Sequence, residues 1–111
     1  MTPAEWQWYG LPGHFVGARY CRFHLCTGVG GFLVSTVGSY RPNGAGVDIQ
    51  VGADRMYETM VFRIDGTCDC GCGEPAHSGR ELDMDGYNDA KLAREGHLAM
   101  CQKWSRKRGA A

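Results

Sequence analysis

The chain changes its hydrophobic period once, and this change limits the folds that are open to it. Between residues 15 and 64, apolar and polar residues alternate in several short runs, whereas from 88 to 104 apolar residues recur every three or four positions. A period of two is typical of strands, and a period near 3.6 is typical of an amphipathic helix. We therefore expect an α+β domain, in which an antiparallel sheet of three or four strands packs against one C-terminal helix.

Three runs between residues 15 and 64 have the composition of strands, and residues 47–51 form a possible fourth, short strand. In residues 15–27, Phe23 and Leu25 fall on one side, and His24 and Cys26 fall on the other, which we expect to be solvated. Residues 32–40 are β-branched and aromatic, and the glycine-rich turn before them predicts a hairpin. The third run, residues 57–64, is the clearest. We expect its inward face, beneath the helix, to be formed by Met60, Phe62 and Ile64.

We place the sheet at residues 14–64 and expect further segments before and after it. Residues 1–13 are an aromatic lead-in, and residues 65–87 are a Cys/Gly/Asp-rich loop. The helix is expected at 88–105 with Asn88 and Asp89 at its start, followed by a basic tail at 106–111. Its inward stripe is predicted to be Ala90, Ala93, His97, Met100, Cys101 and Trp104.

Length and charge narrow the function classes. A chain of 111 residues supports one hydrophobic core and one domain. The formal net charge is +0, so no overall field favours nucleic acid or an anionic membrane. No apolar run reaches the length of a membrane span, and the first residues lack the pattern of a secretion signal. We therefore expect a cytoplasmic protein with reduced cysteines.

The cysteines suggest one structural zinc ion. His97 and Cys101 are four residues apart on the predicted helix, so both can reach one ion. Cys70 and Cys72, with Cys68 as an alternative ligand, could complete a tetrahedral Cys₃His site and tie the loop to the helix. The cysteine spacing differs from that of a zinc knuckle. The alternative is a loop of reduced cysteines, with His97 as a core histidine that hydrogen-bonds across the sheet and Cys101 as a small apolar filler.

The sequence contains no recognisable catalytic constellation, and no cofactor-binding residues are predicted. The glycines at 28–31 lack the spacing of a dinucleotide fingerprint. A candidate ligand surface can be drawn around Thr36, Tyr57, Glu58 and His97. We therefore lean toward a protein that is not an enzyme.

Four segments together resemble a known family: GLPGHFVG at 10–17, VSTVG at 34–38, YETMVF at 57–62 and GHLAMC at 96–101. The family consists of small uncharacterised proteins encoded by bacteriophages and prophages of high-GC bacteria. The resemblance implies an accessory protein in the cytoplasm of an infected bacterium, and the family has no assigned enzyme activity.

Two function classes remain open. The first is a non-enzymatic binding module that inhibits a host macromolecule, a protein or ribonucleoprotein of a defence system, by stoichiometric occupancy. The second is a small-ligand or nucleotide-binding protein, or an enzyme, that uses the candidate surface around Thr36, Tyr57, Glu58 and His97.

Overall fold

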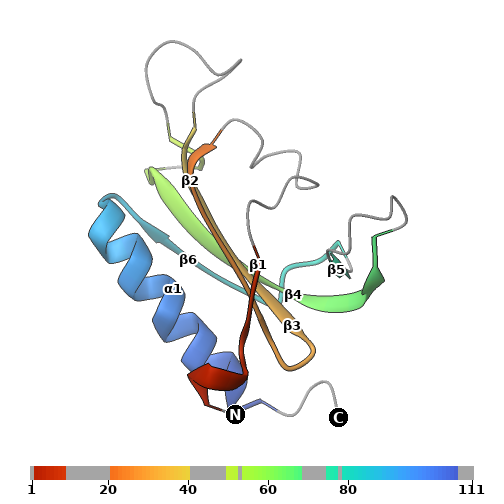
Figure 1. The fold of residues 1–111 in the computed structure, drawn as a ribbon. Helices are drawn as coiled ribbons and strands as arrows, with labels where there is room; N and C mark the ends of the chain where they lie inside the picture. The colour runs from red at the N-terminus through yellow and green to blue at the C-terminus, as the bar shows by residue number, and fades with distance from the viewer. Residues whose placement is uncertain are drawn as a thin grey trace.

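In the computed structural model, the C-terminal helix lies across one face of an antiparallel sheet (Figure 1). The structure describes residues 2–9, 21–40, 50–52, 54–68, 75–77 and 79–107. The elements are the 3₁₀ turn η1 (Pro3–Glu5), β1 (Gln7–Tyr9), β2 (Cys21–Val29), β3 (Phe32–Tyr40), β4 (Tyr57–Thr67), β5 (Pro75–His77), β6 (Asp83–Tyr87) and α1 (Ala90–Ser105). The expected α+β class is confirmed. No helix in these described ranges is long and apolar enough to cross a membrane.

Among the residues that the structure describes, the sheet has six strands, which is more than the three or four expected. Its order is β1-β2-β3-β4-β5, and β6 also pairs with β4. The two short partners share one side of β4, with β6 along Tyr57–Val61 and β5 near Ile64 and Thr67. The additional strands lie in the segments expected to be a lead-in and a loop. β1 and β5 have only 3 residues each, which is too short for a periodic signal.

A two-residue turn joins β2 to β3. Val29 pairs with Phe32, and Gly30 and Gly31 form the turn between them. Gly30 has φ 63°, which glycine adopts without steric cost. The predicted hairpin is therefore confirmed.

The register corrects the predicted faces of β4. Thr27, Val34 and Val61 lie in one cross-strand row on the helix side, and Val34 and Val61 join the core there. Met60, Phe62 and Ile64 therefore point away from the helix, so their predicted position beneath it is wrong. Phe62 is buried on that opposite face, with its ring 4.3 Å from the His77 ring of β5.

The same register shows why the alternation of apolar and polar residues could not identify the face that packs against the helix. Both faces of the central strands are buried, because Val34 on one face and Leu33 on the other are each 0% exposed. Cys26, predicted on a solvated face, is 4% exposed. A period of two separates two faces but does not say which one meets the helix.

The helix follows the sequence prediction closely. Asp89 is its N-cap, and its side chain accepts hydrogen bonds from the backbone N–H groups of Lys91 and Leu92. The predicted stripe faces the sheet: Ala93, His97, Met100 and Cys101 are buried, and Ala90 and Trp104 are half-buried. The core between the layers consists of Trp6, Val29, Phe32, Val34, Val61, Met100 and Cys101, with Trp104 packed against it.

Candidate functional site

A histidine lies at the centre of the helix–sheet interface. His97 is 0% exposed, and both of its ring nitrogens have hydrogen-bond partners on the sheet. The Nε2 atom is 2.8 Å from the Thr27 hydroxyl on β2, and the Nδ1 atom is 2.7 Å from the Thr36 hydroxyl on β3. The antiparallel pairing of β2 with β3 holds these two threonines on the same face. The helix thus places one imidazole between two strands.

The hydrogen bonds continue on both sides of His97. The Thr36 hydroxyl is 2.5 Å from the Thr59 hydroxyl on β4, and the Cys101 thiol lies within hydrogen-bonding reach of Thr27. With its proton on Nδ1, His97 donates to Thr36, which donates to Thr59, and Thr27 donates to Nε2. With the proton on Nε2, each of these bonds reverses. Every hydroxyl can therefore be satisfied in either tautomer.

Burial sets the protonation states in this threonine–histidine network, which we define as Thr27, Thr36, Thr59, His97 and Cys101. Burial lowers the pKa of His97 from 6.5 to about 4 and raises the pKa of Cys101 from 9.0 to about 11. At neutral pH the imidazole is neutral and the thiol is protonated. All five side chains are 0% exposed, so substrate cannot contact them without opening of the interface. The network orders the core.

The residues of the candidate ligand surface lie in separate parts of the structure. Thr36 and His97 contact each other, but both are fully buried. Tyr57 packs edge-on against Phe23, with ring centroids 5.4 Å apart. Glu58 lies on the opposite face of β4 and accepts a hydrogen bond from Arg55 at 2.9 Å. These residues do not form one open surface.

Of the predicted zinc ligands, the structure describes His97, Cys101 and the alternative ligand Cys68. Cys70 and Cys72 lie outside the described residues, so the zinc site stays a prediction. Cys68 follows the end of β4 and is half-buried, and Cys101 is buried beside Thr27. No group of three or more metal-ligating side chains occurs among the residues that the structure describes. The two hydrogen bonds of His97 match the alternative of a core histidine.

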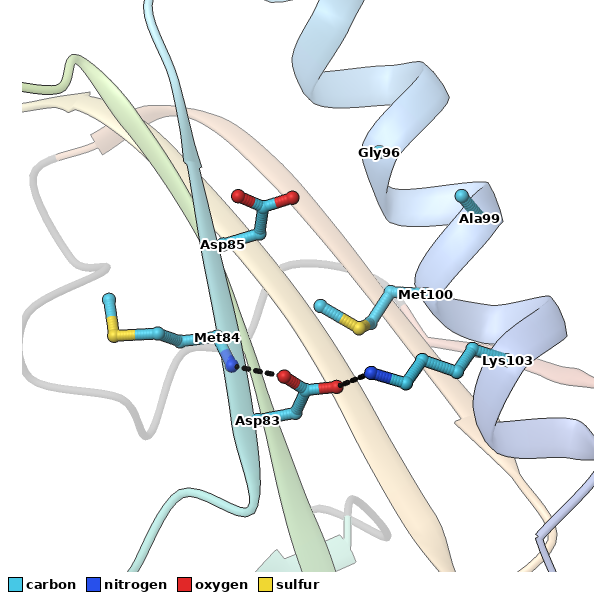
Figure 2. A pocket seen from close by; sticks show the side chains of 7 residues that line it. All are labelled: Asp83, Met84, Asp85, Gly96, Ala99, Met100 and Lys103. Carbon is cyan, nitrogen blue, oxygen red and sulfur yellow. Dashed lines mark hydrogen bonds and ion pairs between the residues drawn. The ribbon is translucent and has the colours of Figure 1, made fainter.

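An open groove lies beside the network, between β6 and α1 (Figure 2). Its volume is about 270 Å³, just below the range of about 300–1,000 Å³ for small-ligand pockets. Its lining residues are Asp83, Met84, Asp85, Gly96, Ala99, Met100 and Lys103. The helix contributes the small residues Gly96 and Ala99 and the longer side chains of Met100 and Lys103, and the Tyr87 ring lies against Gly96. We call this site the β6–α1 groove.

The two aspartates of the groove differ in their surroundings. Asp83 accepts hydrogen bonds from the Lys103 ammonium at 2.7 Å and from the Trp104 indole at 3.0 Å. Burial alone would raise the pKa of Asp83, but these bonds and the Lys103 charge outweigh it and lower the pKa. Asp85 is exposed and accepts from the Gly86 backbone N–H at 2.9 Å. Within the described part of the chain, the ion pairs are Arg55–Glu58 and Lys103–Asp83, and Asp85 belongs to neither.

Sequence reasoning missed the groove because it missed β6. Residues 83–87 lie within the segment 65–87 that the sequence predicts to be a Cys/Gly/Asp-rich loop. The available signal was the alternation of Asp83, Asp85 and Tyr87 with Met84 and Gly86, which places both carboxylates on one face of a strand.

Comparisons of the chain with protein families, with curated proteins and with solved structures find no match.

Proposed function

We propose that this protein is a non-enzymatic binding module that acts by occupying a protein partner in a fixed ratio. The observation that supports this proposal is the contrast between the network and the groove. His97 and Cys101, the residues best suited to chemistry, are buried, uncharged and hydrogen-bonded. The β6–α1 groove and the outer edge of β6 are open and bear an exposed carboxylate. Such an arrangement suits recognition of a surface.

The resemblance to phage-encoded proteins supplies the setting of the proposal. In that setting the partner is a protein or ribonucleoprotein of the host bacterium, and a component of a defence system is the target we propose. A small inhibitor needs one complementary surface of about 800 Å² per partner and no assembled chemistry.

The proposal is tested by capture and titration. The tagged chain is used to capture partners from a lysate of a defence-competent bacterium, and the complex is weighed by native mass spectrometry. We expect one protein partner in a whole-number ratio, and we expect inhibition of that partner to be complete near one equivalent. Turnover of a substrate at catalytic concentrations would contradict the proposal. Recovery of a bound nucleotide in place of a protein would favour the small-ligand class.

A further inference from the structure

The outer edge of β6 carries an unusual set of hydrogen-bonding groups. In the pairing with β4, Thr59 lies opposite Asp85 and Val61 lies opposite Asp83, and the Tyr87 carbonyl accepts from the Met56 N–H. Backbone groups alternate in direction along a strand, so Met84 and Gly86 direct theirs away from β4. No further strand pairs with this edge among the elements that the structure describes.

The donors of that edge are already used within the chain. The Met84 N–H donates to the Asp83 carboxylate, and the Gly86 N–H donates to the Asp85 carboxylate, each at 2.9 Å. The outward carbonyls of Met84 and Gly86 and the free oxygen of Asp85 remain as acceptors. The edge therefore offers acceptors and negative charge, and it fits a partner that brings donors and positive charge.

The groove gives a cationic side chain a place to lie. In Figure 2, the Asp85 carboxylate points from β6 into the space beside Gly96 and Ala99 of α1. The Lys103 ammonium is held at Asp83, which leaves the negative charge of Asp85 without an ion-pair partner in the described structure. An aliphatic stem can rest on Ala99 and Met100 while its charged end meets Asp85.

From these contacts we propose that the β6–α1 groove and the β6 edge bind an extended, arginine- or lysine-bearing segment of a partner protein. This inference deepens the proposed function and rests on it. The exposed apolar side chains of Leu82 (41%) and Met84 (38%) lie along the same edge. Figure 2 shows Met84 pointing away from the groove, so a docked strand meets acidic groups on one face and apolar groups on the other. The best-fitting segment thus alternates basic and apolar residues.

The charges exclude the simplest other occupants. A second copy of the chain would place its own Asp83 and Asp85 against these carboxylates, and like charges directly opposite on adjacent strands destabilise the pairing. A nucleic acid would bring phosphates to the same acidic edge and be repelled.

The inference is tested with a defined peptide. The full chain, labelled with ¹⁵N, is titrated with a blocked pentapeptide Val-Arg-Thr-Arg-Val and with the same peptide carrying glutamate for arginine. We expect chemical-shift changes at Met84–Gly86 and Gly96–Lys103 with the arginine peptide only. Binding should weaken as salt rises from about 0.05 to 0.5 M, since these charges are exposed.

Two variants separate the groove from other surfaces. Asp85→Asn keeps the size of the side chain and removes its charge, and we expect a loss of affinity of about fivefold, the upper range for an exposed ion pair. Ala99→Leu fills the groove from an exposed helix position and should also weaken binding. Asp65→Asn, at an exposed position on β4 beyond the end of β6, is the matched control and should bind like the wild type. The folded state of each variant is checked by its spectrum.

Equal binding of both peptides, shifts confined to another surface, or no effect of Asp85→Asn would overturn the inference. Concentration-dependent dimerisation through β6 would identify a second copy as the occupant and would overturn it as well.

The proposed function is tested separately by the captured partner. If that partner binds Asp85→Asn and Ala99→Leu as tightly as the wild type, the function stands and the groove is not its site. If no partner is captured, the proposed function fails whatever the peptide does.

Discussion

Acidification is the perturbation that tests the threonine–histidine network most directly. Burial lowers the pKa of His97 from 6.5 to about 4, because the buried site penalises the charged imidazolium. In the unfolded chain His97 takes up its proton near its ordinary pKa, so between these two values the unfolded state binds more protons. The stability contributed by this group is therefore complete above pH 6.5 and is lost as pH falls toward about 4.

The loss of folding free energy on acidification follows from the difference between the pKa of His97 in the unfolded and the folded state. A lowering from 6.5 to about 4 corresponds to about 3 kcal/mol at about 1.36 kcal/mol per unit. About 2 kcal/mol of this is already lost at pH 5, since the unfolded histidine is then almost fully protonated. A domain of this size has a total stability of about 5–15 kcal/mol, so the effect is large enough to measure by equilibrium unfolding.

The assay compares wild type with His97→Gln, which retains hydrogen-bonding groups and does not titrate. Urea unfolding is measured at pH 7, 6 and 5, and the variant curve is subtracted to remove the contribution of the other titrating groups. We expect the wild type to lose about 2 kcal/mol more than the variant between pH 7 and 5. The imidazole resonance of His97 in wild type is followed in parallel, which keeps the test valid if the variant fails to fold. A His97 resonance that titrates near pH 6.5, with no extra loss of stability, would refute the reasoning.

Two substitutions test the sheet independently of the network. Phe62→Ala is expected to cost about 3–5 kcal/mol in urea unfolding, because Phe62 is buried against His77 on the face away from the helix; a change near zero would contradict that burial. Gly38→Ala is expected to lower stability by about 3 kcal/mol, since Gly38 has φ 153° and a Cβ there would overlap the Met56 carbonyl oxygen; an unchanged melting temperature would show that β3 and β4 approach less closely than described.

The helix was predictable because its signals are local. Asp89 caps it, and the spacing of Ala93, His97, Met100 and Cys101 identifies the buried face before any partner is known. The hairpin around Gly30 was predictable for the same reason, because the turn needs a residue that tolerates positive φ.

The candidate site was much less predictable, because its parts come from separate strands. Thr27, Thr36 and Thr59 have ordinary strand composition, and only the register places their hydroxyls beneath one histidine. β6 has two aspartates and a glycine, a composition that disfavours strands, and its pairing with β4 overrides the local preference. The β6–α1 groove exists only once that strand is paired.

The predicted zinc site can be tested through the hydrogen bonds of His97. A zinc ion held by Cys70, Cys72, His97 and Cys101 needs a ring nitrogen with a free lone pair, whereas both nitrogens of His97 are hydrogen-bonded to threonines. Zinc at either ring nitrogen would therefore replace the hydrogen bond to one threonine, so zinc binding and the complete network exclude each other.

Zinc is measured by elemental analysis of protein purified without an affinity metal, together with melting in the presence of a chelator. If the network persists in solution, we expect no chelator effect on the melting temperature, and we expect Thr36→Val to destabilise the protein by about 1–3 kcal/mol by leaving a buried ring nitrogen unpaired. One zinc per chain, with a melting temperature that falls on chelation, would show that the cysteine-rich segment takes one ring nitrogen of His97 from its threonine. Structural zinc contributes its binding free energy to folding, so such a site would be evident as a large fall in melting temperature.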